Sequence, residues 1–170
     1  MKEVYQNVYV GTTEDYEALL TAHAGSLGEW AFIIAARDPY HRREVGWTGR
    51  GCPKDNPEYL YAYRDNPCRI VLNMLDGKSA EWIPDLLVGA ALIFAKSYYR
   101  EGRKLLFVCN QGHSRGPGLA LAFLRRYCWQ EDLLQMGYVE SKAMFTKTNY
   151  PDFLPGTGVD QWLAQHWEEL

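Results

Sequence analysis

The 170-residue sequence lacks an apolar run long enough to span a membrane. Its longest such run extends from Leu86 to Ala95 and is interrupted by Gly89, whereas a membrane-spanning helix needs about 20 apolar residues. The residues Met1 to Val4 are also not followed by the apolar core of a signal peptide. We therefore expect no membrane association and a cytoplasmic location.

Cysteine is scarce and is not arranged for metal binding. The four cysteines show no CxxC spacing, and no pair of histidines stands at the spacing of metal ligands. A disulfide framework is not indicated either, since such frameworks belong to short, cysteine-rich secreted chains. We expect no metal, no cofactor and a reducing compartment for the cysteines, which are Cys52, Cys68, Cys109 and Cys128.

The chain also lacks an excess of positive charge. It has 18 Lys and Arg against 21 Asp and Glu, for a formal net charge of −3. Because nonspecific nucleic-acid binding depends on a basic surface, we expect none. A hydrophobic content of 47% and a charged content of 23% are typical of a globular chain with a full core. We expect residues 1–170 to form a single, monomeric domain.

Short apolar runs alternate with helical patterns along the chain. The alternating β-branched and aromatic residues of 3–11 predict an edge strand or a hairpin. This order predicts an α/β fold, in which a central, mainly parallel, twisted sheet of about four to five strands carries helices on both faces. Buried strands are predicted at 31–36, 69–75 and 104–108. The first helix is predicted to begin with an N-cap at Thr13, the second to cover 84–99, and the third to run from the loop after Cys109 to about Cys128. Further helical segments are predicted at 133–136, at 142–145 and around Trp162 and Trp167.

The segment from Cys109 to Arg115 joins a predicted buried strand to a predicted helix and contains residue types that can bind and attack a phosphate group. In such a place, backbone N–H groups and the helix dipole converge on a hollow that suits a tetrahedral oxyanion. Arg115 can add a bidentate fork, and positive surroundings favour the thiolate form of Cys109, which is the nucleophile. The segment predicts a phosphate-binding loop formed by Asn110, Gln111, Gly112, His113, Ser114 and Arg115.

A plainer interpretation of the same residues exists. A cysteine and an arginine at this spacing occur by chance in many proteins, and a cysteine at the end of a strand is commonly a small buried hydrophobe. The order of strand, glycine-containing loop and helix favours the phosphate site, because this is the context that the chemistry needs.

Cys109, five further residues and Arg115 resemble the signature of the cysteine-dependent protein phosphatases, and the compact size points to their dual-specificity branch. Gly112 and Pro117 match further positions of that signature. The resemblance implies hydrolysis of phosphate monoesters through a cysteinyl-phosphate intermediate, without metal or cofactor.

The loop departs from that signature at two positions. Val108 stands where the family usually has histidine, and Gly116 stands where it usually has serine or threonine. In the family this hydroxyl helps the thiolate to leave when the phosphoenzyme is hydrolysed. The resemblance therefore leaves open both a slow second step and phosphate binding without turnover.

An aspartate near the loop is expected, because an acid must protonate the leaving oxygen. The family carries its acid on a loop at about the place of Asp76, which lies 33 residues before Cys109, so the resemblance assigns the acid to Asp76. A plain turn at Asp76-Gly77 is the alternative. Weaker candidates for the acid are Asp85, Asp38 and Asp55.

The stretch 37–54 has few strand or helix signals and is long for a loop in a compact domain, which is typical of binding loops and lids. Its basic residues, chiefly Arg42, Arg43 and Arg50, either hold further substrate phosphates, with Tyr40 or Trp47 stacking on a ring, or lie on a solvated loop. His113 and Ser114 similarly either face the substrate or fill the loop.

The function that we predict is a phosphatase acting on phosphotyrosine and phosphoserine or phosphothreonine in proteins or peptides. Two alternatives stay open. One keeps the enzyme but changes the substrate to a nucleotide, an RNA end or another small phosphorylated molecule. The other is a phosphate-binding module without turnover.

Overall fold

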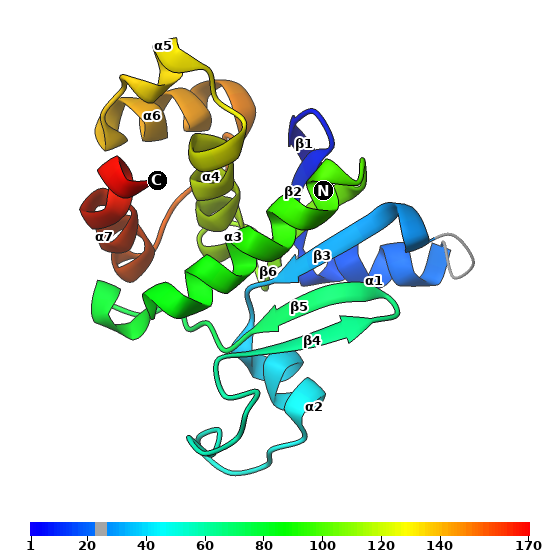
Figure 1. Cartoon of the computed structure of the whole chain (residues 1–170). Coiled ribbons are helices and arrows are strands. Elements are labelled where there is room, and N and C mark those ends of the chain that lie inside the picture. Colours follow the sequence, from blue (N-terminus) through cyan, green and yellow to red (C-terminus); the bar gives the residue numbers. More distant parts are fainter. Residues whose placement is uncertain (23–26) are drawn as a thin grey trace.

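The computed structural model describes residues 1–22 and 27–170. Its centre is a six-stranded sheet in the order β1-β2-β6-β3-β5-β4 (Figure 1). The four inner strands β2, β6, β3 and β5 are parallel, and the two outer strands are antiparallel to their neighbours. The strands are β1 (Lys2–Tyr5), β2 (Val8–Thr12), β3 (Trp30–Ile34), β4 (Tyr61–Asp65), β5 (Cys68–Leu72) and β6 (Lys104–Cys109).

The inner strands are mostly apolar because both faces of the sheet are covered. Every residue of β3 is buried, and in β6 only Lys104 is partly exposed, which confirms two of the predicted buried strands. The third is shorter than predicted. It ends at Leu72, and the N–H of Asn73 adds one further bond in the register of the β4 and β5 pair by donating to the carbonyl of Leu60 at 2.8 Å.

The sheet has six strands instead of the four to five predicted from the sequence. The stretch 3–11 forms a hairpin and so supplies two strands, β1 and β2. The strand β4, which pairs antiparallel with β5, was not predicted from the sequence. The aromatic alternation of Tyr61 and Tyr63 before a turn at Asn66-Pro67 is the signal that marks this strand.

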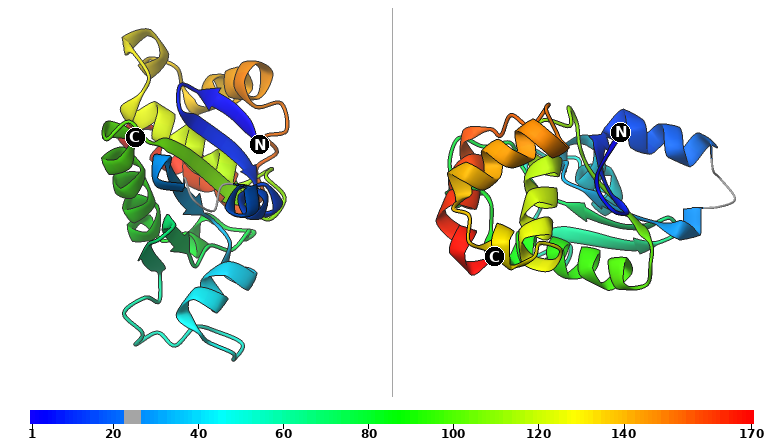
Figure 2. Two further views of the ribbon diagram at one scale, coloured as in Figure 1. Left: turned by 90° about the vertical axis from the view of Figure 1, so that its right-hand side faces the viewer. Right: turned by 90° about the horizontal axis from the view of Figure 1, so that it is seen from above.

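Helices cover both faces of the sheet, as predicted (Figures 1 and 2). On one face, Tyr16 and Leu19 of α1 pack with Phe32 and Val108. On the other, α3, α4 and α7 bury a larger core. The helices are α1 (Thr13–Ala22), α2 (Arg42–Val45), α3 (Asp85–Arg100), α4 (Arg115–Tyr127), α5 (Glu131–Leu134), α6 (Tyr138–Met144) and α7 (Thr157–His166), with short helical turns at Leu27–Glu29, Arg37–His41, Ala80–Trp82, Phe145–Asn149 and Trp167–Glu169.

The cap of α1 lies one residue earlier than predicted. Thr12, not Thr13, accepts from the N–H of Asp15 through its hydroxyl at 3.1 Å, and the Asp15 carboxylate accepts from the N–H of Thr12 at 2.8 Å. This reciprocal pair is a capping box. In the C-terminal part, the predicted helical pieces are present, and Trp162 and Trp167 pack into the core.

The stretch 37–54 is only partly a loop, which corrects the sequence analysis. It begins with the turn Arg37–His41 and continues as α2. Trp47 is only 7% exposed, and the guanidinium of Arg42 lies 4.2 Å from the centre of its ring. Trp47 is therefore part of the packing and is not presented for stacking on a ligand.

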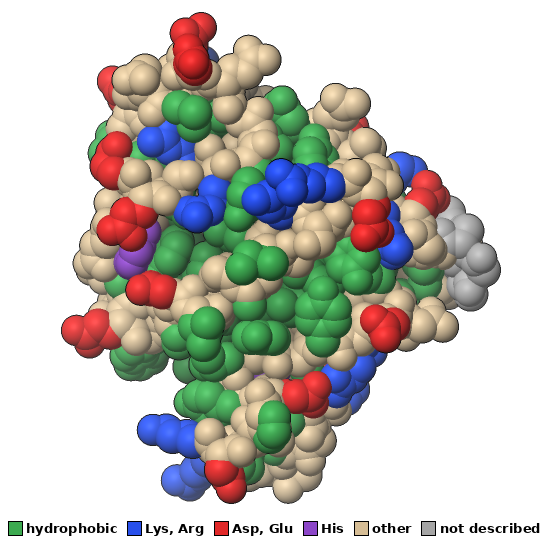
Figure 3. Space-filling model, in the orientation of Figure 1, with side chains coloured by type: hydrophobic (Ala, Val, Ile, Leu, Met, Phe, Trp, Pro, Cys, Tyr) green, Lys and Arg blue, Asp and Glu red, His purple; other side chains and the backbone are tan. Residues whose placement is uncertain are grey.

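Within the described ranges, no helix has both the length and the apolar character needed to cross a membrane. On the face shown in Figure 3, acidic and basic side chains are interspersed around apolar ones. Leu86 and Ile93 of α3 are among the exposed apolar residues.

Candidate active site

Cys109 is the last residue of β6, at the carboxyl end of a central strand. It pairs with Thr12 of β2 and is 2% exposed. The chain then crosses a loop, 110–114, and enters α4 at Arg115. The carboxyl ends of parallel strands are where α/β proteins bind ligands, and the strand, loop and helix follow in the order predicted from the sequence.

Gly112 gives the loop its shape. Its φ is +71°, in the left-handed region that favours glycine, and its N–H donates to the carbonyl of Cys109 at 3.3 Å. The neighbouring N–H groups of Gln111, His113 and Ser114 have no acceptor among the described residues. Free N–H groups on a tight loop ahead of a helix suit an anion.

Arg115 adds a fixed positive charge to this loop. Its side chain is only 11% exposed, and its Nη1 donates to the carbonyl of Met74 at 2.9 Å. Its Nε is buried, has no hydrogen-bond partner among the described residues, and lies 4.0 Å from Oδ2 of Asp76. A buried donor without a partner carries a desolvation cost that a bound oxyanion would offset.

Asp76 follows β5 and reaches the same loop. The hydroxyl of Ser114 donates to its Oδ1 at 2.9 Å. The side chain of Asp76 is 43% exposed, so a substrate can reach it. The structure thus brings the three residues predicted to act in catalysis to one cavity of about 400 Å³, lined by Asp76, Cys109, Asn110, Gln111, His113, Ser114, Arg115, Leu154 and Gly156.

A C-terminal segment that sequence reasoning missed completes the site. The N–H of Leu154 donates to the carbonyl of His113 at 2.9 Å, and Nδ1 of His113 donates to the carbonyl of Asp152 at 3.1 Å. The N–H of Gly156 donates to the hydroxyl of Ser114 at 2.9 Å. His113 and Ser114 therefore fix the loop to this segment. The Pro-Gly-Thr-Gly stretch at 155–158 is the one sequence signal near this segment, since the residues that the segment contacts lie about 40 positions away in sequence.

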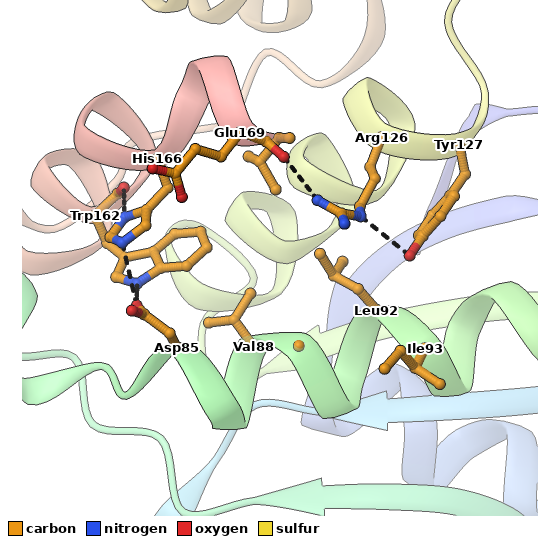
Figure 4. Close-up of a pocket in the computed structure, with 11 residues that line it drawn as sticks. Asp85, Val88, Leu92, Ile93, Arg126, Tyr127, Trp162, His166 and Glu169 are labelled. Carbon is orange, nitrogen blue, oxygen red and sulfur yellow. Dashed lines mark hydrogen bonds and ion pairs between the residues drawn. The ribbon is translucent and has the colours of Figure 1, made fainter.

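The other acid candidates are placed elsewhere. Asp55 is exposed on the stretch before β4. Asp85 lines a separate cavity of about 210 Å³, where it accepts from Nε1 of Trp162 at 2.8 Å and lies 3.2 Å from Nε2 of His166 (Figure 4).

Asp38 lies beside the loop but is occupied by two arginines. Its carbonyl accepts from Nδ2 of Asn110 at 3.2 Å, and its carboxylate pairs with Arg37 at 2.6 Å and with Arg42 at 2.7 Å. Burial acts to raise the pKa of Asp38, but these two guanidinium groups outweigh it and lower that pKa. Asp38 is therefore held as a carboxylate and is a poor acid.

The three basic residues proposed to contact substrate do not line the cavity that holds Cys109. Arg42 packs on Trp47 and pairs with Asp38. Arg43 and Arg50 are exposed on the surface. The bond from Asn110 to Asp38 joins the start of their segment to the phosphate loop.

No family model and no curated protein matches this chain by sequence. Solved structures do match it. Human DUSP28 superimposes with a TM-score of 0.60 at 16% identity, over 99% of this chain and 92% of that one. The fold is that of the small dual-specificity phosphatases. This likeness confirms the fold that the sequence predicts.

Two further structures share the fold. The human tyrosine phosphatase-like serine/threonine/tyrosine-interacting protein matches with a TM-score of 0.61 at 17% identity, over 99% of this chain and 95% of that one. OH1 from the Orf virus, a tyrosine phosphatase with triple substrate specificity, matches with a TM-score of 0.57 at 18% identity, over 97% of this chain and 84% of that one.

Proposed function

We propose that residues 1–170 form one catalytic domain of a cysteine-dependent phosphatase, which needs no metal and no cofactor. The observation that carries this proposal is the cavity in which Cys109, Arg115 and Asp76 meet around a loop with free N–H groups. Each of the three supplies one part of phosphoryl transfer, and all three come from different elements of the fold.

In the first step the thiolate of Cys109 attacks phosphorus and the bond to the leaving oxygen breaks. Arg115 and the loop N–H groups hold the nonbridging oxygens, where negative charge must be stabilised. Asp76 gives its proton to the leaving oxygen. The products of this step are the free alcohol or phenol, the cysteinyl phosphate and the Asp76 carboxylate.

In the second step water attacks the cysteinyl phosphate. The Asp76 carboxylate takes a proton from that water, the bond between sulfur and phosphorus breaks, and the Cys109 thiolate and inorganic phosphate are released. Gly116 supplies no hydroxyl to assist the departing thiolate. We therefore place the slow step here.

The proposed substrates are proteins or peptides that carry phosphotyrosine, phosphoserine or phosphothreonine. Leu154 supports this class, because it is 77% exposed and lines the cavity, where it offers apolar surface to the group that bears the phosphate. The stretch 37–54 with Arg42, Arg43 and Arg50 would then contact the substrate beyond the phosphate. The reaction requires reduced Cys109, which fits the cytoplasmic location expected from the sequence.

A phosphate-binding module without turnover is the second candidate. The observation that favours it is the pair of departures from the family signature, Val108 and Gly116. Such a module would keep the anion-binding loop and Arg115 but would stop before or after the first step. A small phosphorylated molecule as substrate also stays a candidate.

Hydrolysis of p-nitrophenyl phosphate and its inhibition by vanadate test these proposals. We expect turnover in the wild type and a loss on the order of 10³-fold or more in Cys109→Ser, with vanadate binding retained. Cys128→Ser is the matched control, because burial raises the pKa of that thiol to about 11 and it stays protonated at neutral pH. Undiminished turnover in Cys109→Ser would exclude the mechanism, and vanadate binding without turnover in the wild type would favour the binding module.

A further inference from the structure

Ser114 makes two hydrogen bonds that together orient the carboxyl group of Asp76. The N–H of Gly156 lies 2.9 Å from its hydroxyl oxygen, and Oδ1 of Asp76 lies 2.9 Å from the same atom. A backbone N–H can only donate, so the hydroxyl must accept from Gly156. Its single proton is then free to point at Asp76.

This direction favours a proton on the other oxygen of Asp76, because the carbonyl oxygen of a protonated carboxyl group is a better acceptor than its hydroxyl oxygen. Oδ1 accepts from Ser114 and therefore has no proton directed along that bond. The other oxygen, Oδ2, is the one that lies 4.0 Å from Nε of Arg115. A proton on Oδ2 is thus placed on the side of the carboxyl group that faces the anion site.

The loop around Asp76 is held by the first turn of α7. The N–H of Gly158 donates to the carbonyl of Gly77 at 3.0 Å, and the N–H of Ala80 donates to the side chain of Gln161 at 3.3 Å. A Cβ atom on Gly156 would lie 2.5 Å from Oδ1 of Asp76, and one on Gly158 would lie 2.7 Å from the carbonyl oxygen of Gly77. Only glycine allows this close approach.

We infer that Ser114 is a positioning residue for the acid. Held by Gly156 at the N-terminus of α7, it places the proton of Asp76 on Oδ2. This inference rests on the proposed phosphatase function and deepens it. It assigns to the C-terminal segment a part in the acid step, so the acid is arranged before substrate binds and needs no closing loop.

The test compares kcat/KM for phenyl phosphate, whose leaving group needs an acid, with that for 2,4-dinitrophenyl phosphate, whose leaving group does not. The value of kcat/KM depends on the steps up to formation of the cysteinyl phosphate, so slow hydrolysis of that intermediate does not change it. We expect Ser114→Ala to lower the phenyl phosphate value about tenfold more than the dinitrophenyl value, because positioned acids contribute on the order of 10²–10⁴-fold. The matched control is Ser141→Ala, since Ser141 is a buried serine outside the site.

A second pair of variants tests the same link without removing the hydroxyl. Gly156 and Gly137 both precede a helix with nearly the same backbone angles, φ −62° and ψ 157° against φ −66° and ψ 166°. A Cβ atom on Gly137 would meet no atom within 4 Å. We expect Gly156→Ala to change the leaving-group ratio as Ser114→Ala does, and Gly137→Ala to leave it unchanged.

A double-mutant cycle separates positioning from a general weakening of the loop. In the Asp76→Asn background, Ser114→Ala should change the ratio by less than about twofold, because the group that it positions is gone. Equal slowing of both substrates by Ser114→Ala would overturn the inference, and so would a full effect of Ser114→Ala in the Asp76→Asn background. Neither result would contradict the proposed hydrolysis by Cys109.

Amide hydrogen exchange supplies a readout that needs no turnover. Ser114→Ala removes the acceptor of the Gly156 N–H, so this amide and the backbone of 76–80 should exchange faster than in the wild type. Ser141→Ala should not change them. Unchanged exchange in Ser114→Ala would overturn the inference even in a protein that only binds phosphate.

Discussion

A Cβ atom on Gly116 would lie 3.0 Å from the carbonyl carbon of Val108. The two positions at which the loop departs from the phosphatase signature are therefore in contact with each other. The same Cβ atom would lie 3.1 Å from the N atom of Cys109, so the crowding comes from the backbone of β6 and not from a side chain that could rotate. Gly116 does not have a positive φ. Close packing of α4 on β6, and not backbone conformation, is what disfavours a side chain here.

The absence of that hydroxyl predicts a burst. If breakdown of the cysteinyl phosphate is slow, the wild type should release about one equivalent of p-nitrophenol per active site before a slower steady state, because the covalent intermediate accumulates. Stopped-flow absorbance with active-site titration measures this. A linear time course from the first turnover would place the slow step before the intermediate.

Gly116→Ser should shorten the slow phase and leave the burst rate nearly unchanged. It should also lower the free energy of unfolding by about 1–3 kcal/mol, because the backbone of β6 must move to admit the side chain. Urea denaturation and burst kinetics on the same preparation measure both effects. Gly89→Ser is the matched control, since a Cβ atom on this helical glycine would meet no atom within 4 Å. A destabilised but folded Gly116→Ser protein with an unchanged slow phase would show that the missing hydroxyl does not limit turnover.

Arg115→Lys should lower kcat/KM for p-nitrophenyl phosphate on the order of 100-fold or more, the scale set by the loss of an oxyanion donor. Arg115 donates from Nη1 to the carbonyl of Met74 and keeps its Nε free beside Asp76. One ammonium group cannot hold both positions. The inhibition constant of vanadate should rise in parallel. Arg100→Lys, at an exposed position at the end of α3 and outside the cavity, is the control, and equal activity of the two variants would remove Arg115 from the site.

Asp76→Asn should slow hydrolysis of phenyl phosphate on the order of 10²–10⁴-fold and that of 2,4-dinitrophenyl phosphate far less, because only the poorer leaving group needs an acid. Steady-state kcat/KM across a series of aryl phosphates measures the difference. Asp85→Asn is the control, since Asp85 lines the separate cavity of Figure 4. Equal slowing across the series in Asp76→Asn would move the acid to another residue.

The parts of the fold that could be predicted from the sequence are those that show a pattern within a contiguous stretch of residues. The continuous apolar runs of β3 and β6 identified the centre of the sheet, because strands buried on both faces tolerate few polar residues. The loop from Cys109 to Arg115 was found for a similar reason, since the strand, the glycine and the helix that shape it are contiguous.

The features that escaped prediction depend on contacts between distant parts of the chain. The stretch around Gly156 has no pattern of its own that points to Ser114 and Asp76, because the bonds that join them span 42 and 38 residues. Trp47 similarly reads as a free aromatic on a basic loop, and only its packing under Arg42 shows that it is buried.

His41 gives the stretch between β3 and β4 a dependence on pH. The side chain is fully buried, and its Nε2 donates to the carbonyl of Glu58 at 2.8 Å. Burial lowers the pKa of His41, and the bond to Glu58 and the charges of Glu58 and Glu44 offset only part of that effect. The fold therefore prefers the neutral imidazole. This preference stabilises the protein fully above the unfolded value of about 6.5 and is lost as the pH falls through the lower, folded pKa.

We accordingly expect the free energy of unfolding to decrease as the pH is lowered from about 7.5 to about 5.5. His41→Gln should show a smaller decrease, because glutamine keeps a donor for the Glu58 carbonyl but does not titrate. Urea denaturation at the two pH values measures both slopes. The carboxyl groups of Asp38 and Asp160, whose pKa values are also lowered by their basic partners against the effect of burial, titrate below this range and do not contribute to it. Identical slopes in the two proteins would assign the pH dependence to a group other than His41.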